Sequence, residues 1–128
     1  MPLSYRVDKT NNHVNTKVTG PVTVGDILGH FEAARQEEIL GYTELIDARG
    51  IGTSMSTADI WEAALSVKLS RVRLAFGRRA VVVDSDLNFG LVRLFATVVS
   101  GFFPIDVFRD QTEAENWLKL ADGPPEAV

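Results

Sequence analysis

Three aspartates follow predicted strands and are the first candidates for chemistry in this sequence. Asp47 ends the apolar run LID, and Asp84 and Asp86 flank Ser85 directly after a run of three valines. Ligands of α/β proteins often bind at the carboxyl ends of parallel strands, and two neighbouring carboxylates there could do general acid/base work. Asp86 also precedes an apolar helical segment. A structural role as the N-cap of that helix is therefore the favoured interpretation.

Hydroxyl residues in the stretch ELIDARGIGTSMSTADIW form a second candidate site. Ser56 and Thr57 stand at the predicted start of a helix, where backbone N–H groups are free and the helix dipole is positive. A phosphate on either hydroxyl would be stabilised there, so both are candidate phosphoacceptors. The alternative is a capping box between Ser56 and Asp59 that only starts the helix.

Metal binding and covalent catalysis find no support in the residue types. The chain has no cysteine, which excludes disulfides, thiolate ligands and cysteine nucleophiles. His13 and His30 have no second histidine or carboxylate at ligand spacing, so we predict no metal site. P-loop, nucleophile-elbow and dinucleotide-binding patterns are absent, and we expect neither a cofactor nor an enzymatic activity. A reaction built from scattered carboxylates is the least favoured alternative.

Composition predicts one cytoplasmic domain over residues 1–128. The hydrophobic fraction of 45% and the charged fraction of 23% are typical of globular proteins. A net charge of -4 disfavours nucleic-acid binding, which requires a basic surface. The N-terminus MPLSYRVDKTNN lacks the basic and apolar regions of a signal peptide.

One basic cluster, RVRLAFGRR, stands out against this acidic background. We interpret it as the solvated end of a helix and the loop after it, because cations complement the C-terminal end of a helix dipole. The alternative is a surface for an anionic partner. The arginines concerned are Arg71, Arg73, Arg78 and Arg79.

Strands alternate with helices along the chain. Short alternating segments at 5–7 and 14–18 flank the turn residues DKTNNH and predict a β-hairpin. Apolar runs predict strands at 42–48, 78–84 and 105–110. The order of a hairpin, three helix–strand units and a C-terminal helix predicts an α/β fold with a mixed, mostly parallel sheet flanked by helices.

Helical spacing of apolar residues predicts helices over 24–41, 56–74, 87–103 and 112–121. Capping boxes are expected at Thr23 with Asp26 and at Thr112 with Glu115. The apolar stripe of the second helix is predicted to consist of Ile60, Trp61, Ala64, Leu65, Leu69 and Val72.

The predicted helix 87–103 carries more apolar surface than one side of a helix usually does. Its length, its two glycines and Arg93 near its middle oppose a membrane span. Packing inside the protein or against a partner is the first interpretation, so we expect a protein partner or self-association through this helix. The alternative is a ligand pocket with Trp61, Phe89 and Arg93, in which the arginine binds an acidic head group.

Several of these patterns together resemble the SpoIIAA-like, STAS-related group of small bacterial proteins. They are the hairpin followed by GPVT, the strand LIDARG, the segment DSDLNFGLVRLF and the ending DVFRDQTEAENWL. The resemblance extends from Tyr5 to Leu118. It implies a superhelix of βα units around a mixed sheet, the fold of anti-sigma-factor antagonists and of CRAL-TRIO lipid carriers. It also implies binding of proteins, nucleotides or lipids, and no catalysis.

In the antagonist branch, a turn reading roughly Asp-Ser-Ser-Gly at a helix start carries a serine that a kinase phosphorylates. On this chain the turn falls on Met55, Ser56, Thr57 and Ala58. The hydroxyls match, whereas the aspartate and the glycine do not. The departure favours a helix-start role for the hydroxyls over a phosphorylation switch.

The leading hypothesis is a non-catalytic regulatory or binding module of STAS-like type that acts through protein–protein contacts as a homodimer. The alternative is a carrier or sensor of a lipid-like amphipathic molecule at a membrane surface. In that case the helices 56–74 and 87–103 would close over the ligand.

Overall fold

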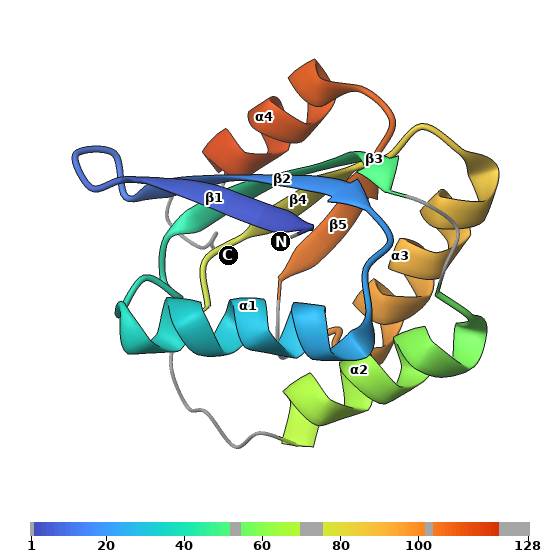
Figure 1. Ribbon diagram of the computed structural model, residues 1–128. Coiled ribbons are helices and arrows are strands. Elements are labelled where there is room, and N and C mark those ends of the chain that lie inside the picture. Colours follow the sequence, from blue (N-terminus) through green and yellow to red (C-terminus); the bar gives the residue numbers. More distant parts are fainter. Residues whose placement is uncertain (1, 52–54, 70–75, 102–103, 121–128) are drawn as a thin grey trace.

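The computed structural model describes residues 2–51, 55–69, 76–101 and 104–120. These residues form five strands and four helices in three layers (Figure 1). In chain order the elements are β1 Leu3–Asp8, β2 His13–Gly20, α1 Val24–Gln36, β3 Thr43–Ile51, α2 Thr57–Leu69, β4 Arg79–Val82, α3 Asp86–Val98, β5 Ile105–Phe108 and α4 Gln111–Leu120. The predicted element order is confirmed.

The strands lie in the sheet in chain order, β1-β2-β3-β4-β5. β1 and β2 pair antiparallel, and the later pairs are parallel. The carboxylate of Asp8 closes the hairpin turn by accepting hydrogen bonds from the backbone N (3.2 Å) and the side-chain N (2.7 Å) of Asn11. Asn12 has a φ of 51°, a left-handed conformation that asparagine tolerates. The predicted hairpin and the mixed, mostly parallel sheet are confirmed.

Helices cover both faces of the sheet (Figure 1). One helix connects each of the neighbouring strand pairs β2-β3, β3-β4 and β4-β5. Because these crossovers have the same hand and proceed across the sheet in the same direction, α1, α2 and α3 lie on the same face. α4 lies on the opposite face, where it contacts β3, β4 and β5. Among the described helices, none is long and apolar enough to cross a membrane.

The valine run around β4 is buried from both sides. Val81 and Val83 pack into the core under α1, α2 and α3, whereas Ala80 and Val82 pack with Ala114 and other residues on the α4 side. Each of these four residues is at most 6% exposed. Because both faces are covered, the run is continuously apolar and does not alternate.

Helix starts are partly as predicted. The capping boxes of α1 and α2 are confirmed: Asp26 N lies 3.1 Å from Thr23 Oγ1, and Asp59 N lies 3.1 Å from Ser56 Oγ. The back bonds to Thr23 N (3.0 Å) and Ser56 N (3.1 Å) complete both boxes. The role of Ser56 as part of a cap is therefore observed directly.

The predicted caps of α3 and α4 are wrong. Ser85, with extended φ and ψ of -138° and 154°, caps α3 and accepts a bond from Asn88 N (3.2 Å), so Asp86 lies in the first turn. Asp110 accepts a bond from Glu113 N (3.0 Å) and caps α4, whereas a capping box of Thr112 with Glu115 was expected. Near the start of each helix, more than one residue is of a type that can act as an N-cap. Only the backbone conformation decides which one does.

The apolar stripe predicted for α2 is rotated in the structure. Its buried residues are Ile60, Ala63, Ala64 and Val67, which follow the i, i+3, i+4, i+7 spacing of one helix face. Trp61 is 48% exposed and Leu69 is 71% exposed, so neither belongs to the core. Val72 lies outside the described residues.

The helices α1 and α3 end earlier than predicted. α1 ends at Gln36, and Glu38 adopts a left-handed φ of 60° just after it. α3 ends at Val98, and Gly101 follows with a φ of 80°. The last residues of the segments predicted at 56–74 and 87–103 fall partly outside the described residues.

Replacing Asp110 by alanine should lower the free energy of unfolding by about 1 kcal/mol, because the N–H of Glu113 loses its acceptor. Thr112→Ala is the matched control and should cost less than about 0.5 kcal/mol. Urea denaturation followed by circular dichroism measures both. A larger loss for Thr112→Ala than for Asp110→Ala would contradict the assigned cap.

Candidate functional site

Asp47 was expected to end its strand at the edge of the sheet, but it lies in the middle of β3. It is paired with an arginine. Both carboxylate oxygens of Asp47 bind Arg49, through Nε (2.9 Å) and Nη2 (3.0 Å). The Arg49 hydrogen bonds hold the pKa of Asp47 below its usual range, although partial burial opposes this. Exposed Asp84 lies close enough to Arg49 to help raise the pKa of the guanidinium, after the larger effect of Asp47.

Asp86 is directed elsewhere and pairs with Arg109. The structure therefore brings Asp47 and Asp84 to one arginine and Asp86 to another. A carboxylate kept ionised by a hydrogen-bonded guanidinium is a poor proton donor at neutral pH. The general acid/base role weighed for these aspartates thus finds no support in the geometry of Asp47.

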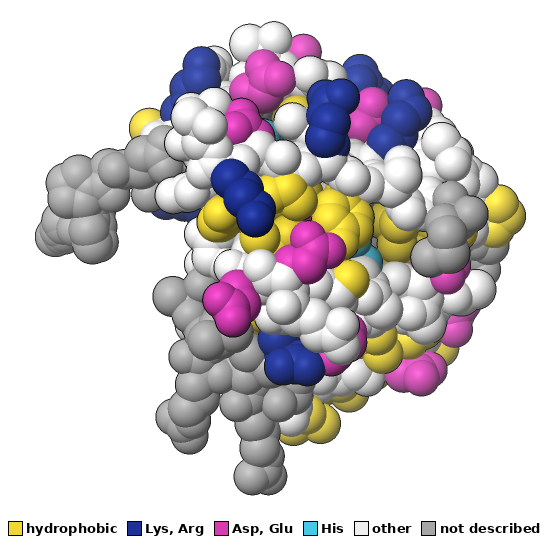
Figure 2. All heavy atoms as spheres, turned by 60° about the vertical axis from the view of Figure 1, so that its left-hand side comes forward, with side chains coloured by type: hydrophobic (Ala, Val, Ile, Leu, Met, Phe, Trp, Pro, Cys, Tyr) yellow, Lys and Arg dark blue, Asp and Glu magenta, His cyan; other side chains and the backbone are white. Residues whose placement is uncertain are grey.

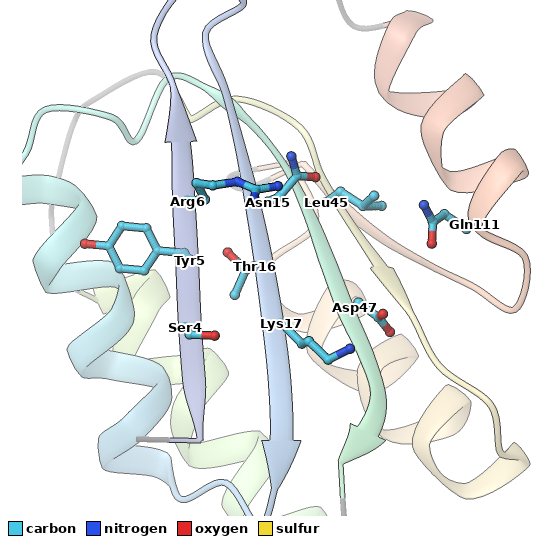
Figure 3. A pocket seen from close by; sticks show the side chains of 9 residues that line it. All are labelled: Ser4, Tyr5, Arg6, Asn15, Thr16, Lys17, Leu45, Asp47 and Gln111. Carbon is cyan, nitrogen blue, oxygen red and sulfur yellow. The ribbon is translucent and has the colours of Figure 1, made fainter.

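The sheet face beside α4 carries a hollow of about 420 Å³ between β1, β2 and β3. Figure 3 shows that its side chains are mainly polar, with Lys17 extending toward Asp47 and Gln111 reaching in from the start of α4. Gln111 accepts a bond from Arg49 Nη2 (3.0 Å). The charged and amide groups near Asp47 bind one another on an open surface, so they do not form a preorganised ligand site.

Of the predicted ligand residues, the structure brings two together. The Arg93 guanidinium lies 5.6 Å from the centroid of the Phe89 ring, and that of Arg109 lies 5.0 Å from the same ring. Trp61 lies on α2 with half of its surface exposed. None of Trp61, Phe89 and Arg93 is among the residues that line the cavity between the sheet and α1, α2 and α3.

That cavity has a volume of about 130 Å³ and an apolar lining. A smaller cavity of about 40 Å³ adjoins it and shares part of its wall. His30 is the one ionisable residue among the lining residues, which are Leu3, Val18, Val22, Ile27, His30, Phe31, Ile46, Ala48, Ile51, Met55, Ile60, Val81, Val92, Phe95 and Ile105.

His30 connects the cavity to a buried polar cluster centred on Glu44. His30 Nε2 lies 2.7 Å from Glu44 Oε2, and the two side chains are 8% and 3% exposed. The hydroxyl of buried Thr16 donates a hydrogen bond to the same carboxylate. Arg79, with a side chain 2% exposed, approaches from β4 with its Nε 3.0 Å from Glu44 Oε1.

The Arg79 guanidinium is also fixed by backbone carbonyls. Its Nη1 donates to Gly77 O (2.8 Å) and to Leu40 O (3.2 Å). At Gly77 a Cβ would lie 2.2 Å from the carbonyl oxygen of Tyr42, so only glycine fits where these two segments touch. The buried cation thus meets an anion and carbonyl dipoles, as a charge inside a protein requires.

These contacts correct the interpretation of the basic cluster as a solvated helix end. Arg79 is buried, and Arg78 packs its guanidinium 4.7 Å from the centroid of the Trp117 ring and donates to Trp117 O (3.3 Å). Arg71 and Arg73 lie outside the described residues.

Glu44 and Arg79 are direct neighbours in the register of β3 and β4. The sequence signal for the pair was a charged residue near the start of each of two largely apolar strands.

Opposing effects act on the pKa of Glu44. Burial raises it, whereas the His30 hydrogen bond, the charge of Arg79 and the Thr16 hydrogen bond lower it, and the net result is a pKa below the usual value. Burial also lowers the pKa of Arg79, against the opposing effect of Glu44. Glu44 is therefore an ionised carboxylate. Within the described residues, no three His, Asp or Glu side chains gather to hold a metal.

Replacing Arg79 by methionine should cost about 3 to 5 kcal/mol, because it leaves the Glu44 carboxylate buried without its cation. Adding Glu44→Gln should cost less in the Arg79→Met background than in the wild type. We expect a coupling energy above about 1 kcal/mol in a double-mutant cycle measured by urea denaturation. The Asp86 and Arg109 pair, with side chains 91% and 51% exposed, is the control and should couple by less than about 1 kcal/mol. Equal coupling in both pairs would refute the central role of the buried one.

Stability should also depend on the charge of Glu44 at acidic pH. Since its folded pKa is below that of the unfolded chain, about 4.3, its contribution is complete above that pH and is lost as the pH falls through the folded pKa. The free energy of unfolding should therefore fall more steeply below about pH 5 in the wild type than in Glu44→Gln. Identical slopes in the two proteins would contradict this.

Comparisons with known proteins bear on the fold. No protein-family model matches the chain, and no curated protein shows a significant match. A solved structure from Shewanella loihica PV-4, described as an uncharacterized protein from the DUF3478 family with a SpoIIAA-like fold, is similar with a TM-score of 0.60. The identity is 18%, over 91% of this chain and 93% of the other. The chain has the SpoIIAA-like fold that its sequence predicted.

Proposed function

We propose that the protein is a non-catalytic binding module of STAS-like type whose ligand is a small apolar or amphipathic molecule. The ligand lies between the sheet and α1, α2 and α3. The observation that carries this proposal is the apolar cavity of about 130 Å³ with His30 as its ionisable group. Natural cores contain few voids larger than a water molecule, so a cavity of this size in the core is the strongest candidate for a ligand site.

The cavity volume limits the size of the ligand. An engineered apolar cavity of about 150 Å³ stays dry and binds benzene, so a group of about six carbon atoms fits here. Pockets for drug-sized ligands measure about 300 to 1,000 Å³. Burial of six carbon atoms contributes at most about 5 kcal/mol, equivalent to a dissociation constant of about 0.2 mM. A single short chain or ring therefore fits better than a lipid with two long chains.

The polar groups near the cavity support a binding role over catalysis. Glu44 and Arg79 neutralise each other in the interior, and the Asp47 carboxylate is occupied by Arg49. Neither a serine nor a threonine hydroxyl is among the residues that line the cavity. A nucleophile, a base and an oxyanion site are what an acyl-transfer enzyme would need to bring together.

A module that acts through protein contacts is the second candidate. α3 packs against α2 and β5, which uses much of the apolar surface that suggested self-association. Exposed apolar side chains nevertheless occur on both helices, with Leu87 54% and Trp61 48% exposed. Contact with a partner or with a second copy of the chain would bury these side chains.

Benzene should bind in the cavity and perturb its methyl groups. In methyl NMR spectra recorded with about 1 mM benzene, a concentration above the expected dissociation constant, the signals of Ile60 and Val92 should shift. Val82 and Leu118 pack on the α4 side of the sheet and serve as internal controls. Unchanged cavity methyls, or equal shifts on both sides of the sheet, would refute the proposed site.

Native mass spectrometry of the purified protein tests the second candidate. A dimer supports the interaction module, whereas a monomer that still shows the benzene shifts supports the ligand-binding module alone.

A further inference from the structure

A surface groove of about 190 Å³ lies between β1 and α1 and leads toward the apolar cavity. Leu3 and His30 line both the groove and the cavity. The two spaces are therefore separated by the side chains of an edge strand and of one helix. On the face shown in Figure 2, hydrophobic side chains gather in a hollow bordered by charged ones, and histidine is visible at its margin.

Two glycines of α1 keep this groove open. Gly25 and Gly29 line it, one helical turn apart. A Cβ at Gly29 would meet no atom within 4 Å, and a Cβ at Gly25 would meet only Thr23 Oγ1 at 3.7 Å. Packing thus does not demand glycine at either position. Each glycine costs about 1 kcal/mol of helix stability relative to alanine. We attribute the presence of the two glycines to the need to keep the groove open.

His30 offers a hydrogen-bonding atom at the junction. Its side chain is 8% exposed, and its Nε2 is engaged by Glu44. Within the described part of the chain, no protein group forms a hydrogen bond with its Nδ1. When Nε2–H donates to the carboxylate, Nδ1 of the neutral ring carries a free lone pair. The Tyr5 ring packs edge-to-face with the imidazole, with 5.4 Å between centroids, and holds its orientation.

Charges around the groove favour a neutral ligand. Asp26 lines the groove, and Glu37 accepts a hydrogen bond from the Tyr5 hydroxyl at the groove's wall. The nearest buried cation, Arg79, is already paired with Glu44. An anionic head group would meet two carboxylates and no free cation among these groups, whereas a hydroxyl would lose nothing to charge repulsion.

We infer that the ligand enters between β1 and α1 past Gly29, and that it carries a hydroxyl group which donates a hydrogen bond to His30 Nδ1. The ligand class is a neutral alcohol with an apolar chain or ring of about six carbon atoms. This inference rests on the proposed function, since it assigns a head group and an entrance to the same cavity.

Toluene, benzyl alcohol and benzoate form a matched probe series, because they share a ring and differ in the polar group. We expect the alcohol to bind the wild type at least as tightly as toluene does, although it is better solvated in water, and benzoate to bind weakest. In His30→Phe, the affinity for benzyl alcohol relative to that for toluene should fall about fivefold compared with the wild type, the effect of one lost hydrogen bond. Binding is measured by methyl NMR titration.

Gly29→Leu tests the entrance without touching the cavity. It should reduce the association rate of toluene and of benzyl alcohol at least tenfold, as measured by NMR line shapes. Gly90→Leu on α3 is the control, since a Cβ there also meets no atom within 4 Å, and it should bind like the wild type.

The possible outcomes separate this inference from the proposed function. If toluene does not bind the wild type, both are wrong. If toluene binds but the alcohol gains nothing from His30, or benzoate binds tightest, the assigned head group is wrong. If Gly29→Leu and Gly90→Leu associate equally fast, the assigned entrance is wrong.

Discussion

The rest of the structure depends on the buried contacts of one ionised carboxylate, that of Glu44. It is 2% exposed and meets Thr16 of β2, His30 of α1 and Arg79 of β4. Four elements are therefore joined at one charge. Taking a carboxylate out of water costs several kcal/mol unless its partners are in place, so the register of β2, β3 and β4 and the position of α1 are specified together.

This cluster also shapes the space above the sheet. The His30 bond fixes the middle of α1 on the sheet, and the Tyr5 hydroxyl ties the edge strand to Glu37 at the end of that helix. Toward the start of α1 the helix presents Gly25 and Gly29 instead of large side chains. α1 is consequently held through His30 and Glu37, while the groove follows β1 along the helix from Gly25 to Ala33. The groove and the cavity are thus consequences of where polar contacts and small residues fall along α1.

Local patterns predicted the fold well and the site poorly, for one physical reason. Strands, helices and the caps at Thr23 and Ser56 depend on residues within a few positions of one another. The pair of Glu44 and Arg79 depends on the register of two strands that are 35 positions apart in the chain, and His30 joins them only after α1 has packed. Local patterns also failed within one turn at α3 and α4, where neighbouring residues compete for the same cap.

An apolar void in the core needs a physical explanation beyond imperfect packing. Apolar side chains that line an unfilled space lose the contacts that a close-packed core would give them. Larger side chains at Ala48 or Val81 would reduce the void. A ligand that fills it restores the lost contacts and stabilises the folded state by mass action. Retaining the void is thus costly for a purely structural core and favourable for a protein that binds a small apolar molecule.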